Sequence, residues 1–190
     1  MARILGTIAS SSFEAVGDFE SIATVTVGSG GAANIEFTSI PSTFTHLQIR
    51  GLYSSNLESE IGIQYNSDTT TGNYRRHILE GNGVSAYATY SGFVGNSFYI
   101  GYDNSGNSPS PSDTFSTIVW DILDYKDTNK YKVLRGLSGG NQGNSLGQGI
   151  LGLYSLLWMN TNAITNIKIL PSAGSWKQDC HFALYGIRSA

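Results

Sequence analysis

The spacing of apolar residues constrains the fold of this chain more than any other feature. Segments of roughly four to ten residues, rich in Val, Ile, Thr, Tyr and Phe, alternate with clusters of Gly, Ser, Asn and Asp. Almost no stretch repeats apolar residues at the i, i+3, i+4 and i+7 positions that an amphipathic helix requires. The pattern is typical of an all-β protein.

The predicted strands cover residues 22–27, 34–39, 45–53, 61–66, 74–80, 97–102, 115–125, 131–137, 149–159, 164–170 and 181–187, with 86–90 as a further one. Segment 149–159 could also form a short buried helix, but Gly149 and Gly152 favour a strand. Two packed antiparallel sheets, as in a jelly roll or a related β-sandwich, accommodate these strands in one domain. We therefore expect a single jelly-roll-like antiparallel β-sandwich over residues 21–190, preceded by an N-terminal arm or short helix over residues 1–20.

One predicted strand, 115–125, is apolar on both faces. Ile118 and Trp120 fall on one face, while Val119 and Leu123 fall on the other, because side chains alternate along a strand. Such a strand is either central to a sandwich or covered by a subunit interface.

Composition and charge exclude several classes of partner. Charged residues make up 13% of the chain, the net charge is -3, and no dense basic stripe occurs, so nucleic acid is not expected as a partner. No apolar run approaches the ~18 residues of a membrane-spanning segment, and no signal peptide is evident. Cys180 is the one cysteine, which rules out an internal disulfide and favours synthesis in a reducing cytoplasm.

Two glycine-containing motifs mimic catalytic or cofactor signatures. Residues 136–140 read G-x-S-x-G, but the glycine-rich stretch that follows is predicted as a loop and not as the helix that a nucleophile elbow requires. Residues 28–33 mimic a dinucleotide fingerprint, but another predicted strand follows, so we expect a hairpin turn there. No cofactor is expected.

The sequence also gives little support for a metal site or for acid–base catalysis. His46, His77 and His181 occur singly, without the spacing of a zinc site. Residues 103–107 place oxygen ligands at alternate positions, which suits either a calcium site or ordinary loop-forming Asx chemistry. Glu58 and Glu60 fall at i, i+2, as paired carboxylates of a glycan-active enzyme might, although a solvated strand edge explains them too.

Aromatic residues are the stronger sign of binding. Tyrosines lie among Ser, Gly and Asn, a combination that gives a large contact area at low entropic cost, although Tyr is also an ordinary strand residue. The candidate interface or binding aromatics are Tyr87, Tyr90, Tyr99, Tyr102 and Trp176. The candidate docking arm is Arg3, Ile4 and Leu5. For Trp120 and Trp158 we expect core packing.

Several segments resemble structural proteins of tailed bacteriophages, especially phages of marine bacteria: FTSIPSTFTHLQIRG, QYNSDTTTGNYRRHILEGNG, IVWDILDYKDTNKYKVLRGLSG, LLWMNTNAITNIKIL and HFALYGIR. The resemblance runs over residues 20–188 and lies in the order of the segments. It implies a β-sandwich protein of the virion, assembled in the host bacterial cytoplasm, without enzymatic activity. The implied partners are copies of itself, expected as a homotrimer or a larger symmetric shell, and the major capsid protein or tail proteins.

Three functions follow as hypotheses. The first is a capsid decoration or cement protein, because the chain is compact with only a short N-terminal extension. The second is a tail-fibre or receptor-binding tip that recognises a host surface glycan through Tyr, Asn and Gly residues. The third is a glycan-active enzyme that uses Glu58, Glu60 or Asp121.

Overall fold

All regular elements that the structure describes are β-strands. The computed structural model describes residues 18–57, 59–70, 72–91, 98–103, 114–141 and 149–188, with the backbone alone at 91, 98–100, 102, 103 and 141. The strands are β1 (Phe19–Thr26), β2 (Ile35–Phe37), β3 (His46–Tyr53), β4 (Ser59–Tyr65), β5 (Tyr74–Gly81), β6 (Ala86–Ser91), β7 (Phe98–Asp103), β8 (Ser116–Leu123), β9 (Lys132–Asn141), β10 (Gly149–Trp158), β11 (Ile167–Pro171) and β12 (His181–Ile187).

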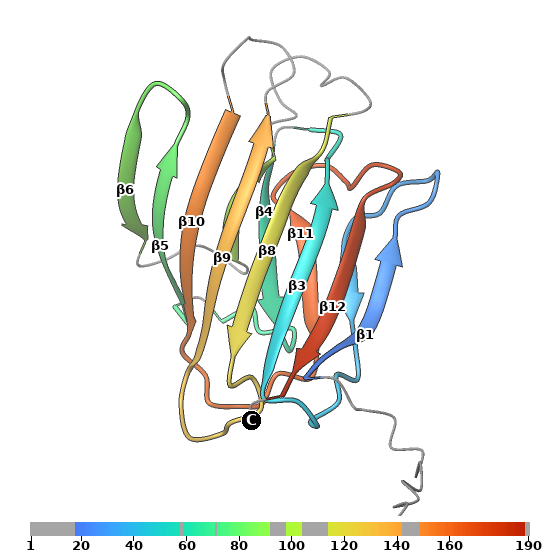
Figure 1. Ribbon diagram of the computed structural model, residues 1–190, viewed down its shortest axis with the longest axis vertical. Coiled ribbons are helices and arrows are strands. Elements are labelled where there is room, and N and C mark those ends of the chain that lie inside the picture. Colours follow the sequence, from blue (N-terminus) through green and yellow to red (C-terminus); the bar gives the residue numbers. More distant parts are fainter. Residues whose placement is uncertain are drawn as a thin grey trace, which may run out of the picture.

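The strands form two antiparallel sheets that pack as a sandwich, as the sequence predicted. The wide sheet has eight strands in the order β1-β12-β3-β8-β9-β10-β5-β6, and the narrow sheet has four in the order β2-β11-β4-β7. Figure 1 shows the wide sheet in front of the narrow one. The pairing of β1, β12, β3 and β8 in one layer, and of β2, β11, β4 and β7 in the other, is the strand order of a jelly roll.

Two inserted hairpins widen one layer of this jelly roll. β5 and β6 lie between β4 and β7 in the chain, and β9 and β10 lie between β8 and β11. All four strands join the wide sheet beyond β8. The wide sheet therefore presents an outer face of twice as many strands as the narrow sheet.

The core lies between the two sheets and is rich in aromatic residues. Tyr65 of β4 contacts Trp158 of β10 with ring centroids 5.4 Å apart, which joins the two layers directly. Ile61 and Ile63 of β4 and Trp120 of β8 are fully buried in the same cluster. Cys180 is buried as well, and its thiol donates to the Ser54 carbonyl over 3.1 Å. Burial of such side chains is the main force that holds the layers together.

The structure corrects three expectations from the sequence: the start of the first strand, the turn at 28–33 and the end of β9. β1 already begins at Phe19, inside the predicted arm, and residues 1–17 lie outside the described residues. Residues 28–33 do not form a hairpin turn, because β1 pairs with β12 in the wide sheet while β2 pairs with β11 in the narrow sheet. Strand β9 continues to Asn141 through part of the predicted glycine-rich loop, because its whole length pairs with β10.

Candidate interaction surface

A row of four apolar side chains crosses the outer face of the wide sheet. Val119 of β8 lies opposite Leu137 of β9, Leu137 opposite Leu153 of β10, and Leu153 opposite Leu79 of β5. These residues are 39%, 53%, 49% and 53% exposed. We call Val119, Leu137, Leu153 and Leu79 the leucine row. Four large apolar side chains in direct register form a continuous exposed patch, and exposed apolar patches are often sites of protein contact.

A polar row runs beside the leucine row, and its members lie two residues away from the leucine row along each strand. It contains Asp121, Arg135, Ser155, His77 and Tyr90, which the strand register places in this order from β8 to β6. Asp121 accepts a hydrogen bond of 2.7 Å from the side-chain amide of Gln48. The rings of His77 and Tyr90 lie 6.1 Å apart. Among the described residues, neither Asp121 nor Arg135 forms an ion pair.

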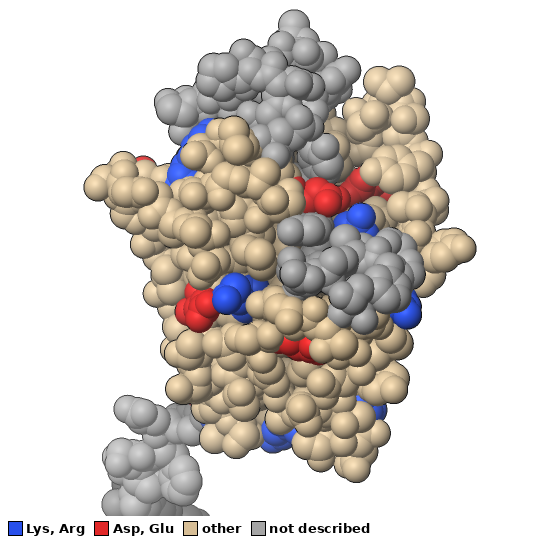
Figure 2. All heavy atoms as spheres, turned by 180° about the vertical axis from the view of Figure 1, so that it is seen from behind, with Lys and Arg blue, Asp and Glu red and all other residues tan. Residues whose placement is uncertain are grey.

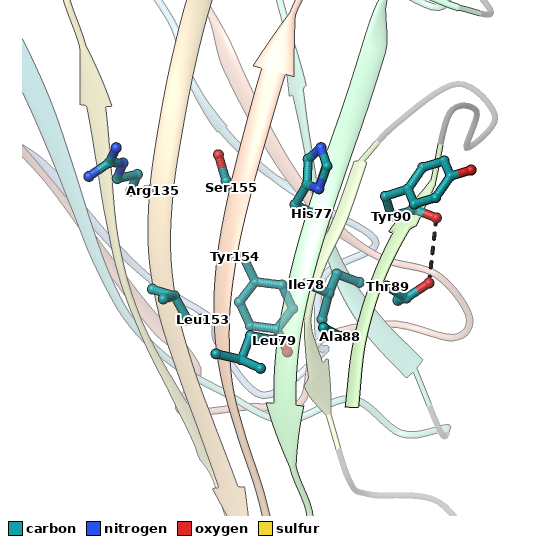
Figure 3. A pocket seen from close by; sticks show the side chains of 10 residues that line it. All are labelled: His77, Ile78, Leu79, Ala88, Thr89, Tyr90, Arg135, Leu153, Tyr154 and Ser155. Atoms are coloured by element: carbon teal, nitrogen blue, oxygen red, sulfur yellow. Dashed lines mark hydrogen bonds between the residues drawn. The ribbon is translucent and has the colours of Figure 1, made fainter. Parts of the chain in front are cut away.

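Parts of both rows line a shallow groove of about 560 Å³: Leu153 and Leu79 of the leucine row, and Arg135, Ser155, His77 and Tyr90 of the polar row. Figure 3 shows Arg135, Ser155, His77 and Tyr90 along one side, with Leu153, Leu79 and Ala88 beside them. Among the described residues that line the groove, none is acidic. It therefore offers an apolar floor, an exposed aromatic ring and a cationic group to whatever covers this face.

The outer face of the narrow sheet has a different character. Glu36 of β2 and Lys168 of β11 lie opposite each other and form an ion pair of 2.8 Å. Gln64 of β4 continues this row, since it lies opposite Lys168 on the other side. Figure 2 views the molecule from this side and shows acidic and basic residues next to each other. The described residues of this row are polar, and the charges of Glu36 and Lys168 balance each other.

The candidate tyrosines fall in different places. Tyr90 is 75% exposed and lines the groove, so it lies on the candidate surface. Tyr87 is half-exposed, but its hydroxyl donates to the carboxylate of Glu80 on the inner side of the sheet. Tyr99 and Tyr102 belong to β7, whose side chains at these positions lie outside the described residues. Arg3, Ile4 and Leu5 also lie outside them.

Trp176 is not a surface aromatic, contrary to the sequence-based expectation. It is only 1% exposed, and its ring contacts Tyr53 and Phe182 at centroid distances of 5.8 and 5.7 Å. Backbone bridges from Ala32 and Ser55 to Trp176 hold its segment against the sandwich and direct the ring inward. Trp120 and Trp158 are fully buried, which confirms their predicted role in core packing.

Glu80 is a buried carboxylate that tyrosine hydroxyls satisfy. Tyr154 and Tyr87 each donate a hydrogen bond to it. Burial, together with the neighbouring Glu80, raises the pKa of the Tyr154 phenol well above its usual range, so this hydroxyl remains a donor at all physiological pH values. The cluster has the chemistry of a satisfied structural network, because each carboxylate oxygen already has a partner.

The carboxylates of the enzyme hypothesis do not converge. Glu60 forms an ion pair of 3.4 Å with Arg76, whereas Asp121 lies on the outer face of the wide sheet. Glu58 and the greater part of the calcium-like segment 103–107 lie outside the described residues. Across the part of the chain that the structure describes, no group of three or more His, Cys, Asp or Glu residues could hold a metal ion.

Ser138, the serine of the G-x-S-x-G motif, lies in the middle of β9 and not at a strand-to-helix turn. Its hydroxyl is buried 3.2 Å from that of Tyr53, between the sheets. A nucleophile elbow instead exposes its serine at the start of a helix. Within the described ranges, the structure also contains no helix long and apolar enough to span a membrane.

Comparison with known proteins adds no family to this picture. The chain matches no protein-family model, and a search of curated proteins finds no match. The surface itself is therefore the basis for a proposed function.

Proposed function

We propose that this chain is a non-enzymatic structural protein of a tailed-phage virion, acting as a capsid decoration or cement protein. The leucine row carries the proposal, because an uncovered apolar strip on a rigid sheet serves protein–protein contact. The resemblance of several segments to tailed-phage structural proteins supports a contact with other proteins of a phage virion. The homotrimer implied by that resemblance is the alternative to the two-fold pair proposed below, and sedimentation of the full chain distinguishes the two.

A decoration protein must occupy many symmetry-related positions on the shell. Its copy number in purified virions, measured by quantitative mass spectrometry against the major capsid protein, should reach the order of hundreds. The purified chain should also bind expanded capsid shells and raise their melting temperature, since a ligand of the folded state stabilises that state. Absence of the chain from purified virions would refute a virion role.

A receptor-binding tip of a tail fibre is the second candidate, and the groove beside Tyr90 favours it. An exposed aromatic ring, the hydroxyl of Ser155 and the guanidinium of Arg135 are groups that can contact a host surface glycan. In this case a few to a few tens of copies would be present per virion, as the closed symmetry of a tail allows. Soluble protein would block phage adsorption, and Tyr90→Ala would abolish that block.

A further inference from the structure

We propose that a second copy of this chain covers the leucine row, with the two wide sheets packed face to face about a two-fold axis. The axis runs parallel to the strands, between β9 and β10. This inference rests on the proposed function, because it names the partner of the same surface. It makes the assembling unit a pair of copies.

The size of the face suits a specific interface. From β3 to β6 the wide sheet is about 24 Å across, at ~4.8 Å between strands. From the Thr117 row to the Leu123 row it extends about 20 Å, at ~3.3 Å per residue. The flat area is about 480 Å², and ridged side chains add to it, so the face approaches the ~600 Å² per partner at the lower end of specific interfaces.

A two-fold axis at this position matches apolar residues with apolar residues. β9 of one copy lies over β10 of the other, and β8 lies over β5. Leu137 then faces Leu153 of the second copy, and Val119 faces Leu79 of the second copy, each pair occurring twice. Sheets that pack face to face align within about 30°, so the central pairs make the closest contact.

The same axis also matches the polar row. Asp121 faces His77 of the second copy, and Arg135 faces Ser155 of the second copy. No two like charges meet along this row. Since Asp121 and Arg135 form no ion pair among the described residues, the second copy supplies polar partners where the single chain leaves charges on an apolar face.

Sedimentation equilibrium of the full chain tests whether a second copy covers the leucine row. We expect a particle with an even number of copies, and we expect Leu153→Asp to raise its dissociation constant about 100-fold, because two carboxylates would be buried against leucines. Val84→Asp is the matched control. Val84 is 83% exposed and apolar too, but it lies in the turn between β5 and β6, so association should not change. A monomer at all concentrations, or a trimer, would overturn the inference.

A short bis-maleimide cross-linker tests the register. Val119→Cys and Leu79→Cys lie three strands apart in one chain, about 14 Å, but face each other across the proposed axis. A mixture of the two single variants should give a covalent pair, and neither variant alone should do so. Cys180 is buried and does not interfere. No cross-link in the mixture, or equal cross-linking of one variant alone, would contradict the register.

The outcomes also separate this inference from the proposed function. A monomeric chain present at hundreds of copies per virion would overturn the two-fold pair and leave the decoration role intact. If the chain formed a two-fold pair but were absent from virions, the decoration role would be overturned and the two-fold pair would stand.

Discussion

The two outer faces of the sandwich differ in the side chains that they present to solvent. The narrow sheet carries the Glu36–Lys168 ion pair, whereas the wide sheet carries the leucine row across four of its strands. The leucine row lies mainly on β5, β9 and β10, which the inserted hairpins contribute. The difference indicates that the inserted hairpins, which also bury core side chains such as Trp158, add a contact surface on the outer face of the jelly roll.

The largest expected change in unfolding free energy comes from substituting a glycine on the inner face of β9, compared with a glycine on its outer face. Gly136 faces the core, where an added Cβ would lie 2.3 Å from Cδ1 of Trp120, so Gly136→Ala should lower the free energy of unfolding by about 3 kcal/mol. Urea unfolding monitored by tryptophan fluorescence measures this loss.

Gly139→Ala is the matched control, three residues further along β9 on the outer face. Its added Cβ would meet Leu151 and Thr117 at ordinary distances of 3.7 and 3.8 Å, so the free energy of unfolding should change by no more than about 0.5 kcal/mol. Equal losses in the two variants would show that the outer face is packed like the core, against this account.

A smaller effect is expected at the turn that joins the two sheets. Asp68, between β4 and β5, accepts hydrogen bonds of 2.7 Å from both Trp158 Nε1 and Asn73 Nδ2. Burial raises the pKa of Asp68, but these bonds and those from Thr70 outweigh it and hold the pKa below its usual value. Asp68→Asn should therefore cost about 1 kcal/mol of unfolding free energy at pH 7.

The pH dependence of this cost has a defined sign. Because the folded pKa lies below the unfolded one, the stabilisation by Asp68 is present above the unfolded pKa of about 3.9 and is lost as the pH falls through the folded pKa. The difference in unfolding free energy between wild type and Asp68→Asn, measured by urea unfolding, should shrink by ~1 kcal/mol between pH 5 and pH 2. Self-association at pH 7 should be unaffected, and a cost that grows on acidification would contradict the assignment.

The smallest effect is expected on the polar face. Lys168→Met removes the ion pair with Glu36, whose side chains are 26% and 39% exposed, so the free energy of unfolding should fall by less than about 1 kcal/mol. The loss should diminish further in high salt. Sedimentation should show unchanged association. If this variant instead dissociated the assembly, the contact would involve the narrow sheet, and the proposed contact through the wide sheet would be wrong.

The sequence was sufficient to predict the strands and the sandwich, because strict alternation and glycine-rich breaks are local signals. It could not predict which strands pair. The segment 28–33 has the composition of a hairpin turn, yet β1 and β2 lie in different sheets because their long-range partners are β12 and β11. Trp176 was misplaced for a similar reason, since its burial depends on bridges to Ala32 and Ser55, far away in the chain.

The candidate surface was predictable only in part. The apolar residues on both faces of 115–125 already pointed to a central strand or an interface, and Val119 is indeed on the exposed face. Leu79, Leu137 and Leu153 come from three segments whose register alone brings them together. No pattern within any one segment could reveal the row.

Thiol labelling of one residue on each face tests the central claim most directly. Leu153→Cys and Glu36→Cys place single exposed thiols on the wide and narrow sheets, at positions that are 49% and 39% exposed in the single chain. We predict that the thiol at position 36 reacts rapidly at every protein concentration, whereas the thiol at position 153 is protected at high concentration and becomes reactive on dilution. Equally rapid labelling of both at all concentrations would show that nothing covers the leucine row and would contradict the account.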